Sequence, residues 1–335
     1  MNVAFTMDFR NAPERRKPWR EFWEDNLWLM CEAEAMGFDI LQVQEHFFTD
    51  DGYGPSMPVF LTSLAQRTTR ARLMAFLYIL PLRNPAQLAQ ETAVLDHLSD
   101  GRLDVAVGIG HRLLEYEAFG IDPRTRGARM EEAMTALKAA WTTRPFSFHG
   151  EYIQLDRIEV RPEPLQQPHP PLWVGATTPR AAARAGRHGA HLAPGAADPA
   201  IVEAYWQARD SAGLDRGGAR IAFGLPATVT REDPDAVWER NKDLYHYRWD
   251  FYRKIRAELG DPALAPANPG PDFYRSYETI GSPEIVIENA RRIVDEFGVT
   301  DFGLFGPPSG VDLRTEGYDT LKLFADEVLP VIHDW

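Results

Sequence analysis

RLMAFLYILPLRNPAQLAQETAVLDHLSDGRLDVAVG, residues 72–108, is the stretch that decides the fold. Its first nine residues, 72–80, are almost all apolar, which predicts a strand buried on both faces. Apolar residues then follow the period of a helix over 85–98, and Asp100-Gly101 marks a turn. Residues 103–108 form a second apolar strand. The order strand, helix, strand is typical of a parallel β-α-β unit.

The same alternation extends over the rest of the chain. Further strands are predicted at 3–7, 39–43, 172–174, 191–193, 220–225 and 300–305, and further helices at 19–36, 57–69, 124–143, 179–187, 199–212, 234–258, 283–297 and 315–332. This pattern, without a linker between two halves, predicts an α/β fold, the (β/α)8 TIM barrel, formed by one domain over residues 1–335. A doubly wound open sheet is the alternative, and it would need a change of composition between two halves.

Insertions are expected after the fourth and the seventh strand. After the fourth, residues 146–160 predict a small hairpin, and the proline-rich residues 162–171 predict an extended connector. After the seventh, residues 260–281 are typical of a loop. We expect the aromatic segment 240–281 to be an insertion that serves as a lid or substrate wall. Packing of its rings in the core is the alternative interpretation.

Composition limits the partners and the compartment. The 335 residues carry a formal net charge of −13, which disfavours nucleic acid and anionic membrane surfaces as partners. No window is long and apolar enough to span a membrane, and the first residues do not resemble a signal peptide. The single cysteine, Cys31, allows no internal disulfide. These features together predict a cytoplasmic protein.

The carboxyl ends of barrel strands are where a site is expected. His46 follows the second strand, beside Phe47 and Phe48. Imidazole titrates near neutrality, so His46 is a candidate for proton transfer, although a histidine satisfied inside the core is the alternative. The nine histidines show no HxxxH or HExxH spacing, so no metal site is predicted.

Two further strand ends carry small residues. Gly108 and Gly110 follow the fourth strand and could let a flat ring or a phosphate approach the backbone, although the Rossmann fingerprint GxGxxG is absent. Gly175-Ala176-Thr177-Thr178-Pro179 follows the fifth strand at a helix start, where free N–H groups and the helix dipole favour an anion. Ordinary capping by Thr178 and Pro179 is the alternative, and both can hold at once.

Short segments spread along the chain occur in a specific order: AMGFD at 35–39, EHFF at 45–48, LP through NP at 80–85, LDHLSDGR at 95–102, GIG at 108–110, EYEAFG at 115–120, RGARME at 126–131 and PPLWVG at 170–175. Each segment alone is weak, but the set resembles the bacterial luciferase-like flavin-dependent monooxygenases from end to end.

The resemblance implies a (β/α)8 barrel, usually a homodimer, that uses reduced FMN supplied by a separate flavin reductase. Reduced FMN and O₂ would give a C4a-hydroperoxyflavin that oxygenates a small organic substrate, which we expect to be apolar or aromatic. An F420-dependent oxidoreductase that transfers hydride on the same barrel is the alternative. A non-catalytic flavin-binding protein is the second alternative.

The resemblance also assigns residues. His46 matches the catalytic histidine. The phosphate loop matches Gly175, Ala176, Thr177 and Thr178, and the wall beside the flavin matches Gly108 and Gly110. Phe76 and Leu77 match a position where relatives carry a non-prolyl cis peptide bond. The substrate pocket is expected at Phe47, Phe48, Tyr78, His111 and Arg112.

Three positions depart from the family pattern. Asn84, expected at the cofactor, stands where many relatives have histidine, and His111 replaces a frequent tyrosine. Ile109 stands where the family often has an arginine that helps to hold phosphate. Arg112 and Arg129 are the nearest candidates to supply the missing positive charge.

Overall fold

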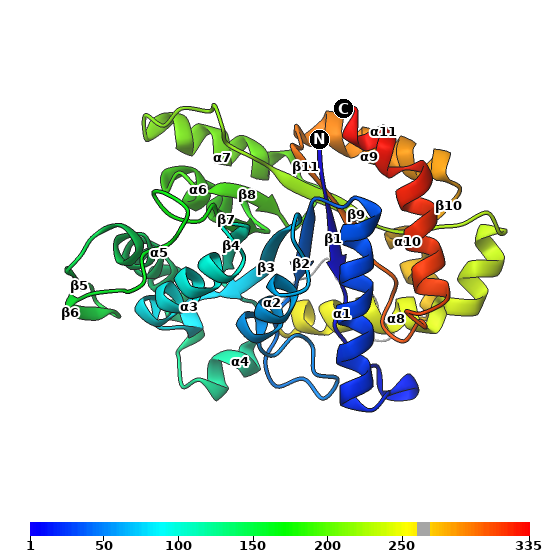
Figure 1. Cartoon of the computed structure of the whole chain (residues 1–335), viewed down its shortest axis with the longest axis horizontal. Helices are drawn as coiled ribbons and strands as arrows, with labels where there is room; N and C mark the ends of the chain where they lie inside the picture. Colours follow the sequence, from blue (N-terminus) through cyan, green and yellow to red (C-terminus); the bar gives the residue numbers. More distant parts are fainter. Residues whose placement is uncertain (260–268) are drawn as a thin grey trace. The chain divides into compact units, whose positions relative to one another are not determined.

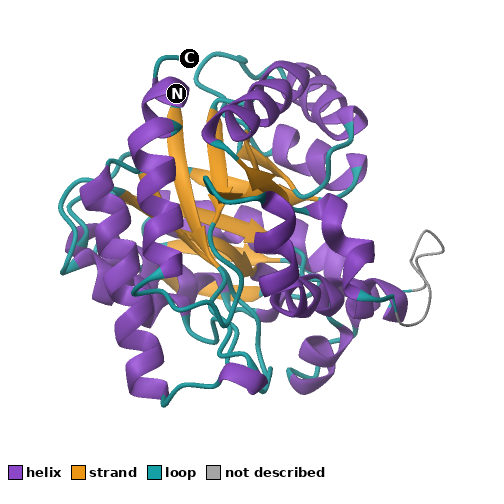
Figure 2. Ribbon diagram, turned by 90° about the vertical axis from the view of Figure 1, so that its right-hand side faces the viewer, coloured by secondary structure: helices purple, strands orange, loops and turns teal. Residues whose placement is uncertain are grey.

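The computed structural model describes residues 1–259 and 269–335, which fall into two compact units. Unit 1 comprises residues 1–55, 111–113 and 223–335, and unit 2 comprises residues 56–110 and 114–222. Helices and strands alternate along the chain in both units (Figure 1), and Figure 2 distinguishes the two kinds of element by colour.

In unit 1, neighbouring strands follow the order β10-β9-β11-β1-β2. The strands are β1 (Asn2–Met7), β2 (Ile40–Val43), β9 (Ala222–Val229), β10 (Thr279–Gly281) and β11 (Asp301–Phe305). β1 pairs in parallel with both β11 and β2, and every residue of β1 after Asn2 is buried. The continuous apolar run at the start of the sequence therefore forms a central strand, as expected for a strand covered on both faces.

The helices of unit 1 are α1 (Trp19–Met36), α8 (Pro234–Glu258), α9 (Pro283–Phe297), α10 (Glu316–Glu327) and α11 (Leu329–His333), with 3-10 turns η1 (Pro13–Arg15) and η4 (Pro271–Tyr277). Gly37 ends α1 with φ of 112°, a conformation that favours glycine. α8 begins with the Asp233 side chain accepting from the Asp235 N–H. Local capping residues thus fix the ends of the helices that frame this unit.

In unit 2, neighbouring strands follow the order β3-β4-β7-β8 and pair in parallel. They are β3 (Arg72–Ile79), β4 (Leu103–Gly108), β7 (Leu172–Ala176) and β8 (His191–Pro194). The helices are α2 (Met57–Ala65), α3 (Pro85–Leu98), α4 (Leu113–Ala118), α5 (Arg126–Thr142), α6 (Pro179–Arg187) and α7 (Pro199–Ser211), with 3-10 turns η2 (Leu80–Leu82) and η3 (Pro123–Thr125). The predicted hairpin is present as β5 (Phe146–His149) and β6 (Gln154–Ile158).

Several predicted elements differ from the structure. The helix predicted over 57–69 ends at Ala65, because the Arg102 guanidinium binds the carbonyl oxygens of Ala65 and Thr68. The helix predicted over 315–332 is divided at Val328 into α10 and α11, because Pro330 has no N–H to continue the ladder. The helix α4 was not predicted.

The prediction of a loop over 260–281 is wrong in its described part. Residues 271–277 form η4, and residues 279–281 form β10, which pairs with β9. A strand of three residues gives too short a pattern to be recognised. Residues 260–268 of the expected lid lie outside the described residues, and the lid role of 240–281 stays a prediction.

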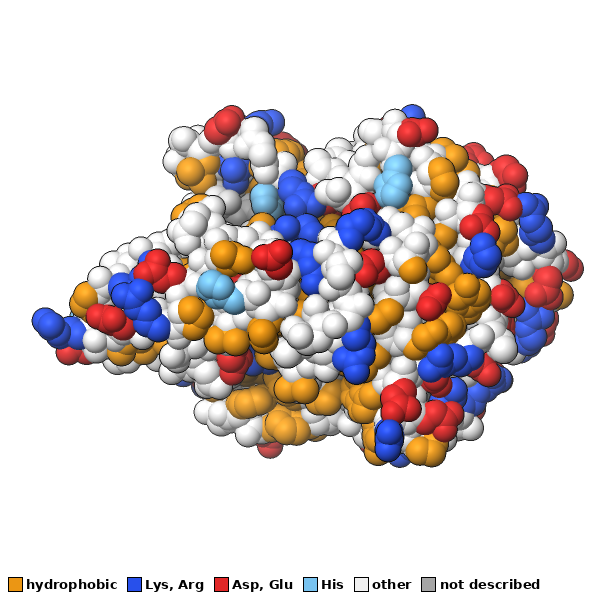
Figure 3. Space-filling model, in the orientation of Figure 1, with side chains coloured by type: hydrophobic (Ala, Val, Ile, Leu, Met, Phe, Trp, Pro, Cys, Tyr) orange, Lys and Arg blue, Asp and Glu red, His pale blue; other side chains and the backbone are white. Residues whose placement is uncertain are grey.

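The surface mixes both signs of charge. On the face in Figure 3, acidic and basic side chains are interspersed with hydrophobic ones, and neither sign covers the whole face. Among the helices that the structure describes, none is both long and apolar enough to cross a bilayer.

Candidate functional site

The candidate catalytic histidine lies on the loop that follows β2. The His46 N–H donates to the Tyr53 carbonyl oxygen at 3.0 Å, and the Tyr53 N–H donates to Thr49 Oγ1 at 2.8 Å. These bonds close the loop on itself. His46 is 7% exposed and is therefore buried.

Four rings surround the His46 imidazole within unit 1. Ring centroids lie 4.8 Å away for Tyr53, 5.2 Å for Phe251, 5.6 Å for His111 and 6.3 Å for Tyr252. Phe251 and Tyr252 belong to α8, from the segment expected to form a substrate wall. The structure therefore brings together His46, the predicted pocket residue His111 and part of that aromatic segment. We call these five residues the histidine cluster.

The two tyrosines of the histidine cluster are joined by hydrogen bonds. The Tyr53 hydroxyl donates to Gln44 Oε1 and is also hydrogen bonded to the Tyr252 hydroxyl. Burial raises the pKa of Tyr53 well above its usual value, and Tyr252 adds to this effect. Burial likewise raises the pKa of Tyr252 to about 12. Both phenols are consequently neutral near pH 7 and can donate hydrogen bonds but cannot serve as bases.

A buried ion pair ties the His46 loop to α8. Arg10 Nε donates to Asp51 Oδ2 at 2.8 Å, and the Tyr247 hydroxyl donates to the same oxygen at 2.5 Å. The Arg10 guanidinium lies 4.6 Å from the Phe251 ring centroid and 5.2 Å from that of Tyr53. Burial alone would raise the pKa of Asp51, but the Arg10 charge and the hydrogen bonds from Tyr247, Arg10 and Thr49 together outweigh burial and lower this pKa.

Arg10 was missed at the sequence level, although it follows directly on the first strand. The carboxyl end of a parallel strand is where a site is expected, and the sequence there reads Asp8-Phe9-Arg10. The position of Arg10 after a strand could therefore have identified it as a site residue, although no sequence motif includes it.

The predicted pocket residues Phe47, Phe48 and Arg112 are also brought together. Arg112 Nη1 donates to the Phe47 carbonyl oxygen, and Nη2 donates to that of Phe48 at 3.4 Å. The Phe48 side chain is exposed, and its backbone has a φ of 57°. Arg112 thus holds the loop around His46, and its expected role in binding phosphate stays a prediction.

In unit 2, Leu77 packs directly on two of the predicted glycines. A methyl group on Gly108 would lie 2.4 Å from Leu77 Cδ1, and one on Gly175 would lie 2.1 Å from Leu77 Cδ2. The Phe76–Leu77 peptide bond is cis, as the resemblance implied. We call Leu77, Gly108 and Gly175 the leucine platform. These two glycines therefore let Leu77 lie against the backbone, and their expected contacts with the flavin and its phosphate stay predictions.

Gly110 is likewise packed closely by a neighbouring side chain. A methyl group there would lie 2.6 Å from Ile79 Cγ2, and its φ of 70° already favours glycine. The room beside Gly110 is therefore taken by a neighbouring strand residue of the same unit.

The predicted phosphate loop opens α6. The Thr178 hydroxyl accepts from the Ala181 N–H at 3.3 Å, which confirms the capping interpretation, while Thr177 and Thr178 are both exposed. A methyl group on Gly195 would lie 2.7 Å from Thr177 Cγ2, so Gly195 lets the next loop approach. Arg180, in the first turn of α6, is an exposed cation that no sequence motif marks.

Two other predicted residues have clear structural roles. The Asn84 side chain caps α3 by accepting from the N–H groups of Ala86 and Gln87. Tyr78 is fully buried, with the Arg83 guanidinium 5.0 Å from its ring centroid. Their expected contacts with cofactor and substrate stay predictions. Within the described ranges, no three or more His, Cys, Asp or Glu side chains gather as a metal site would require.

The chain is similar in sequence to known flavin-dependent monooxygenases. Residues 1–301 match the family model described as luciferase-like monooxygenase. The chain is 30% identical over 333 residues to the oxygenase component of a flavin-dependent trigonelline monooxygenase from Acinetobacter baylyi, covering 94% of this chain and 91% of that protein.

Two further matches are partial. An uncharacterized protein, y4wF, from Sinorhizobium fredii is 35% identical over 171 residues, which span 51% of this chain and 50% of that protein. An F420-dependent glucose-6-phosphate dehydrogenase from Kineococcus radiotolerans is 36% identical over 165 residues, which span 47% of this chain and 48% of that protein. The matched segments therefore cover about half of these two relatives.

One solved structure matches this chain over nearly its whole length. The crystal structure of the monooxygenase RslO1 from Streptomyces bottropensis matches with a TM-score of 0.84 at 24% identity, covering 99% of this chain and 100% of that one. The fold class predicted from the sequence, a parallel α/β fold of the (β/α)8 type, is confirmed by this likeness.

Proposed function

The chain belongs to the luciferase-like monooxygenase family, and on that premise we propose that it is the oxygenase component of a two-component flavin-dependent monooxygenase. It takes reduced FMN from a separate flavin reductase and uses O₂ to oxygenate a small organic substrate. The observation that carries this proposal is the 333-residue match to a protein described as such an oxygenase component.

The chemistry of the α6 loop fits the phosphate of FMN. Thr177 and Thr178 offer exposed hydroxyl groups at a helix N-terminus, where the dipole favours an anion. Arg180 adds a positive charge in the same turn, so it can replace the arginine that is missing at Ile109. The leucine platform presents an apolar side chain suited to a flat ring. When bound, reduced FMN supplies the electrons that activate O₂.

We assign the proton chemistry to His46. Imidazole is a common group for proton transfer in enzymes, whereas the neighbouring phenols of Tyr53 and Tyr252 stay protonated. The rings of the histidine cluster restrict water around this imidazole. His111 and Arg112 border the same imidazole and loop, and we propose them as part of the substrate wall.

A direct test measures whether the protein controls the reaction of reduced FMN with O₂. The purified protein is mixed anaerobically with reduced FMN and then with oxygenated buffer, with and without trigonelline as the first substrate probe. We expect the rate of flavin reoxidation to differ from that of free FMN and to change again in His46→Ala. The matched control is His149→Ala, because His149 lies on the exposed β5–β6 hairpin.

Hydride transfer with F420 is the second candidate, favoured by the 36% identity to an F420-dependent dehydrogenase. Equilibrium binding of reduced FMN and of reduced F420 to the same preparation separates the two. Tight binding of F420 together with no effect on FMN reoxidation would replace the monooxygenase proposal. If both cofactors bind without turnover and His46→Ala changes nothing, the protein is a flavin-binding protein only.

A further inference from the structure

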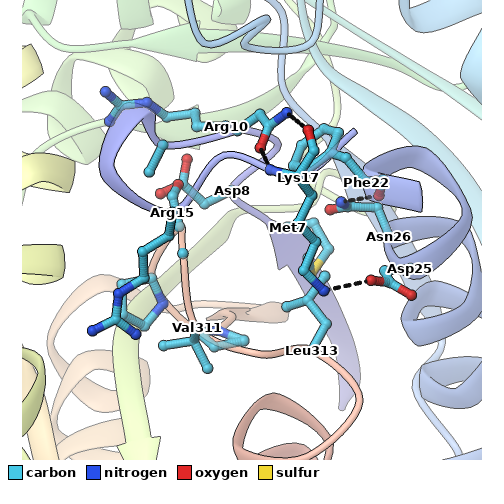
Figure 4. A pocket seen from close by; sticks show the side chains of 16 residues that line it. Met7, Asp8, Arg10, Arg15, Lys17, Phe22, Asp25, Asn26, Val311 and Leu313 are labelled. Carbon is cyan, nitrogen blue, oxygen red and sulfur yellow. Dashed lines mark hydrogen bonds and ion pairs between the residues drawn. The ribbon is translucent and has the colours of Figure 1, made fainter. Parts of the chain in front are cut away.

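Five buried charged side chains form a continuous network in unit 1. In order they are Asp51, Arg10, Asp8, Arg248 and Glu278, and each side chain is less than a tenth exposed. Arg248 joins two of the carboxylates, because its Nε lies 3.3 Å from Asp8 Oδ2 and its Nη1 lies 3.2 Å from Glu278 Oε1. The charge of Asp8 also acts on Arg10, and both side chains line the pocket drawn in Figure 4. We call these five residues the charge network.

The charge network has an odd number of charges. It contains three carboxyl groups and two guanidinium groups, so it carries one excess negative charge when all five are ionised. Arg15 lines the same pocket as Asp8, but its side chain is exposed and water screens its charge. An uncompensated buried charge is costly, and a buried carboxyl group avoids this cost by taking up a proton. One of the three carboxyl groups is therefore expected to be neutral.

The neighbours of each carboxyl group indicate which one it is. Asp51 accepts from Arg10 Nε and from the Tyr247 hydroxyl, and its pKa is lowered by these groups. Asp8 lies in the field of two buried guanidinium groups, those of Arg10 and Arg248. Among the described residues, Glu278 pairs with Arg248 alone, and it shares this cation with Asp8. Glu278 is thus the least compensated of the three.

The hydrogen bonds of Glu278 leave one of its oxygen atoms able to carry a hydrogen. Arg248 Nη1 donates to Oε1 at 3.2 Å, and Trp249 Nε1 donates to the same oxygen at 2.8 Å. Oε2 is buried and has no hydrogen-bond partner in the part of the chain that the structure describes. A proton on Oε2 would consequently displace no donor. In agreement with this geometry, burial raises the pKa of Glu278 and Asp8 adds to the effect, while Arg248 opposes it.

The residues that contact Glu278 adjoin the histidine cluster along α8. Arg248 and Trp249 come directly before Asp250, Phe251 and Tyr252 in this helix. The Trp249 ring centroid lies 6.3 Å from that of Tyr252. Arg248 also fastens α8 to the loop after β11, because its Nη2 donates to the Gly306 carbonyl oxygen at 2.6 Å. A change of charge at Glu278 therefore acts on the segment of α8 that completes the histidine cluster.

We propose that Glu278 is a neutral acid in the native protein near pH 7, and that its ionisation loosens the segment of α8 that carries Phe251 and Tyr252. Ionised Glu278 would compete with Asp8 for Arg248 and leave the charge network with its excess charge. The other titratable group that faces Glu278 is Tyr245 of α8, whose pKa is raised by burial, so it stays neutral. His46 and His111 lie near Arg10, toward the opposite end of the charge network. The fold thus contains a pH-dependent control of the histidine cluster.

The first test compares urea unfolding of wild type, Glu278→Gln and Asp51→Asn between about pH 5 and about pH 9. A glutamine has the shape of the neutral acid, so Glu278→Gln should unfold at the same urea concentration as wild type at pH 7, or at a higher one. Asp51→Asn, the matched control, removes an ionised carboxylate and should unfold at a lower concentration.

The pH dependence has a definite sign. A raised pKa means that the stabilisation by Glu278 is complete below its usual value of 4.5 and is lost as pH rises toward the value in the folded protein. Relative to Glu278→Gln, the unfolding equilibrium constant of wild type should therefore increase with pH, by up to about tenfold per pH unit, and then level off. The pH at which it levels off gives the pKa of Glu278 in the folded protein.

The second test follows α8 directly by amide hydrogen exchange of the full chain, corrected for the intrinsic effect of pH. Above the pH at which the unfolding difference levels off, peptides from α8 should exchange faster in wild type but not in Glu278→Gln, while α5 (Arg126–Thr142) serves as the internal control. An unfolding difference that does not change with pH, or a loss in Glu278→Gln as large as that in Asp51→Asn, would overturn the neutral acid. Unchanged exchange of α8 would overturn the control of the histidine cluster. Neither measurement involves flavin, so the monooxygenase proposal is tested separately.

Discussion

The histidine cluster and the leucine platform are built in opposite ways. The histidine cluster is made of large side chains from segments far apart in the sequence, and it is tied to α8 by the buried Arg10–Asp51 pair. The leucine platform is made of one side chain lying on two residues that have none. Substitutions that shorten a side chain should therefore disrupt the histidine cluster, whereas substitutions that add a side chain to a glycine should disrupt the leucine platform.

The difference also concerns charge. Beside the histidine cluster, the Arg10 guanidinium pairs with Asp51 and contacts the Phe251 ring. In unit 2, the ion pairs of Glu131 hold the C-terminal end of α6, away from the loop at its start. Acid should consequently act on the two regions through different residues.

The largest expected effect comes from removing the imidazole. His46→Ala should lower turnover by about 10²- to 10⁴-fold, the usual contribution of a positioned proton-transfer group. Steady-state kinetics with a coupled flavin reductase measures this effect, and His149→Ala should retain wild-type rates. Equal losses in both variants would show that His46 has no special place in the reaction.

The next effect tests the buried ion pair. Arg10→Gln leaves the Asp51 carboxylate without its cation, which should cost about 3–5 kcal/mol in the free energy of unfolding. The control is Arg16→Gln, whose partner Asp50 is 77% exposed and whose loss should cost less than about 1 kcal/mol. Urea unfolding measures both. Similar values for the two variants would mean that Arg10 does not anchor the His46 loop.

The sequence predicted those parts of the molecule that local signals determine. The helices over 85–98 and 179–187 were placed with correct ends, because Asn84-Pro85 and Thr178-Pro179 are capping pairs that act within a few residues. The strand over 103–108 was likewise bounded by a local turn.

The contacts that define the site were harder to predict. Nothing local relates Arg10 to Asp51 or to Tyr247, since these residues meet only through the tertiary fold. A glycine in a sequence also does not tell which neighbour fills its space. The sequence predicted Gly108 beside the flavin and Gly175 in the phosphate loop, but it gave no sign that Leu77 lies against both.

Addition of a single methyl group should test the leucine platform. Gly175→Ala places a carbon 2.1 Å from Leu77 Cδ2, so Leu77 must move, at a cost of about 1–3 kcal/mol in unfolding free energy. Leu77→Ala in the same chain should recover part of this loss, which a double-mutant cycle measures. Gly127→Ala is the control, because its nearest neighbour would lie 3.9 Å away. Strictly additive effects would contradict direct packing.

Acid should act on unit 2 through Glu131, whose carboxylate contacts Arg184, Arg187 and His188. The hydrogen bond from His188, assisted by Arg184, lowers the pKa of Glu131 to about 2 from its usual 4.5. Its stabilisation is complete above the unfolded-state value and is lost as pH falls from about 4.5 to about 2. Because the side chain is 37% exposed, solvent screening makes the effect smaller than the shift alone suggests. Thermal unfolding should show that Glu131→Gln destabilises at neutral pH and that the difference from wild type shrinks in acid.

The smallest effect separates the two roles of the α6 loop. Thr178→Ala removes a helix cap and should cost about 1 kcal/mol in unfolding free energy, whereas Thr177→Ala, which removes no capping bond, should leave stability unchanged. If the loop holds phosphate, Thr177→Ala should still weaken FMN binding by about three- to tenfold, as loss of one hydrogen bond to an anion predicts. Quenching of flavin fluorescence gives the affinity, and competition by inorganic phosphate shows which part of FMN is bound. Unchanged FMN affinity in Thr177→Ala, beside a normal loss of stability in Thr178→Ala, would reduce the loop to a helix cap, and the phosphate would then have to be sought at Arg112 or Arg129.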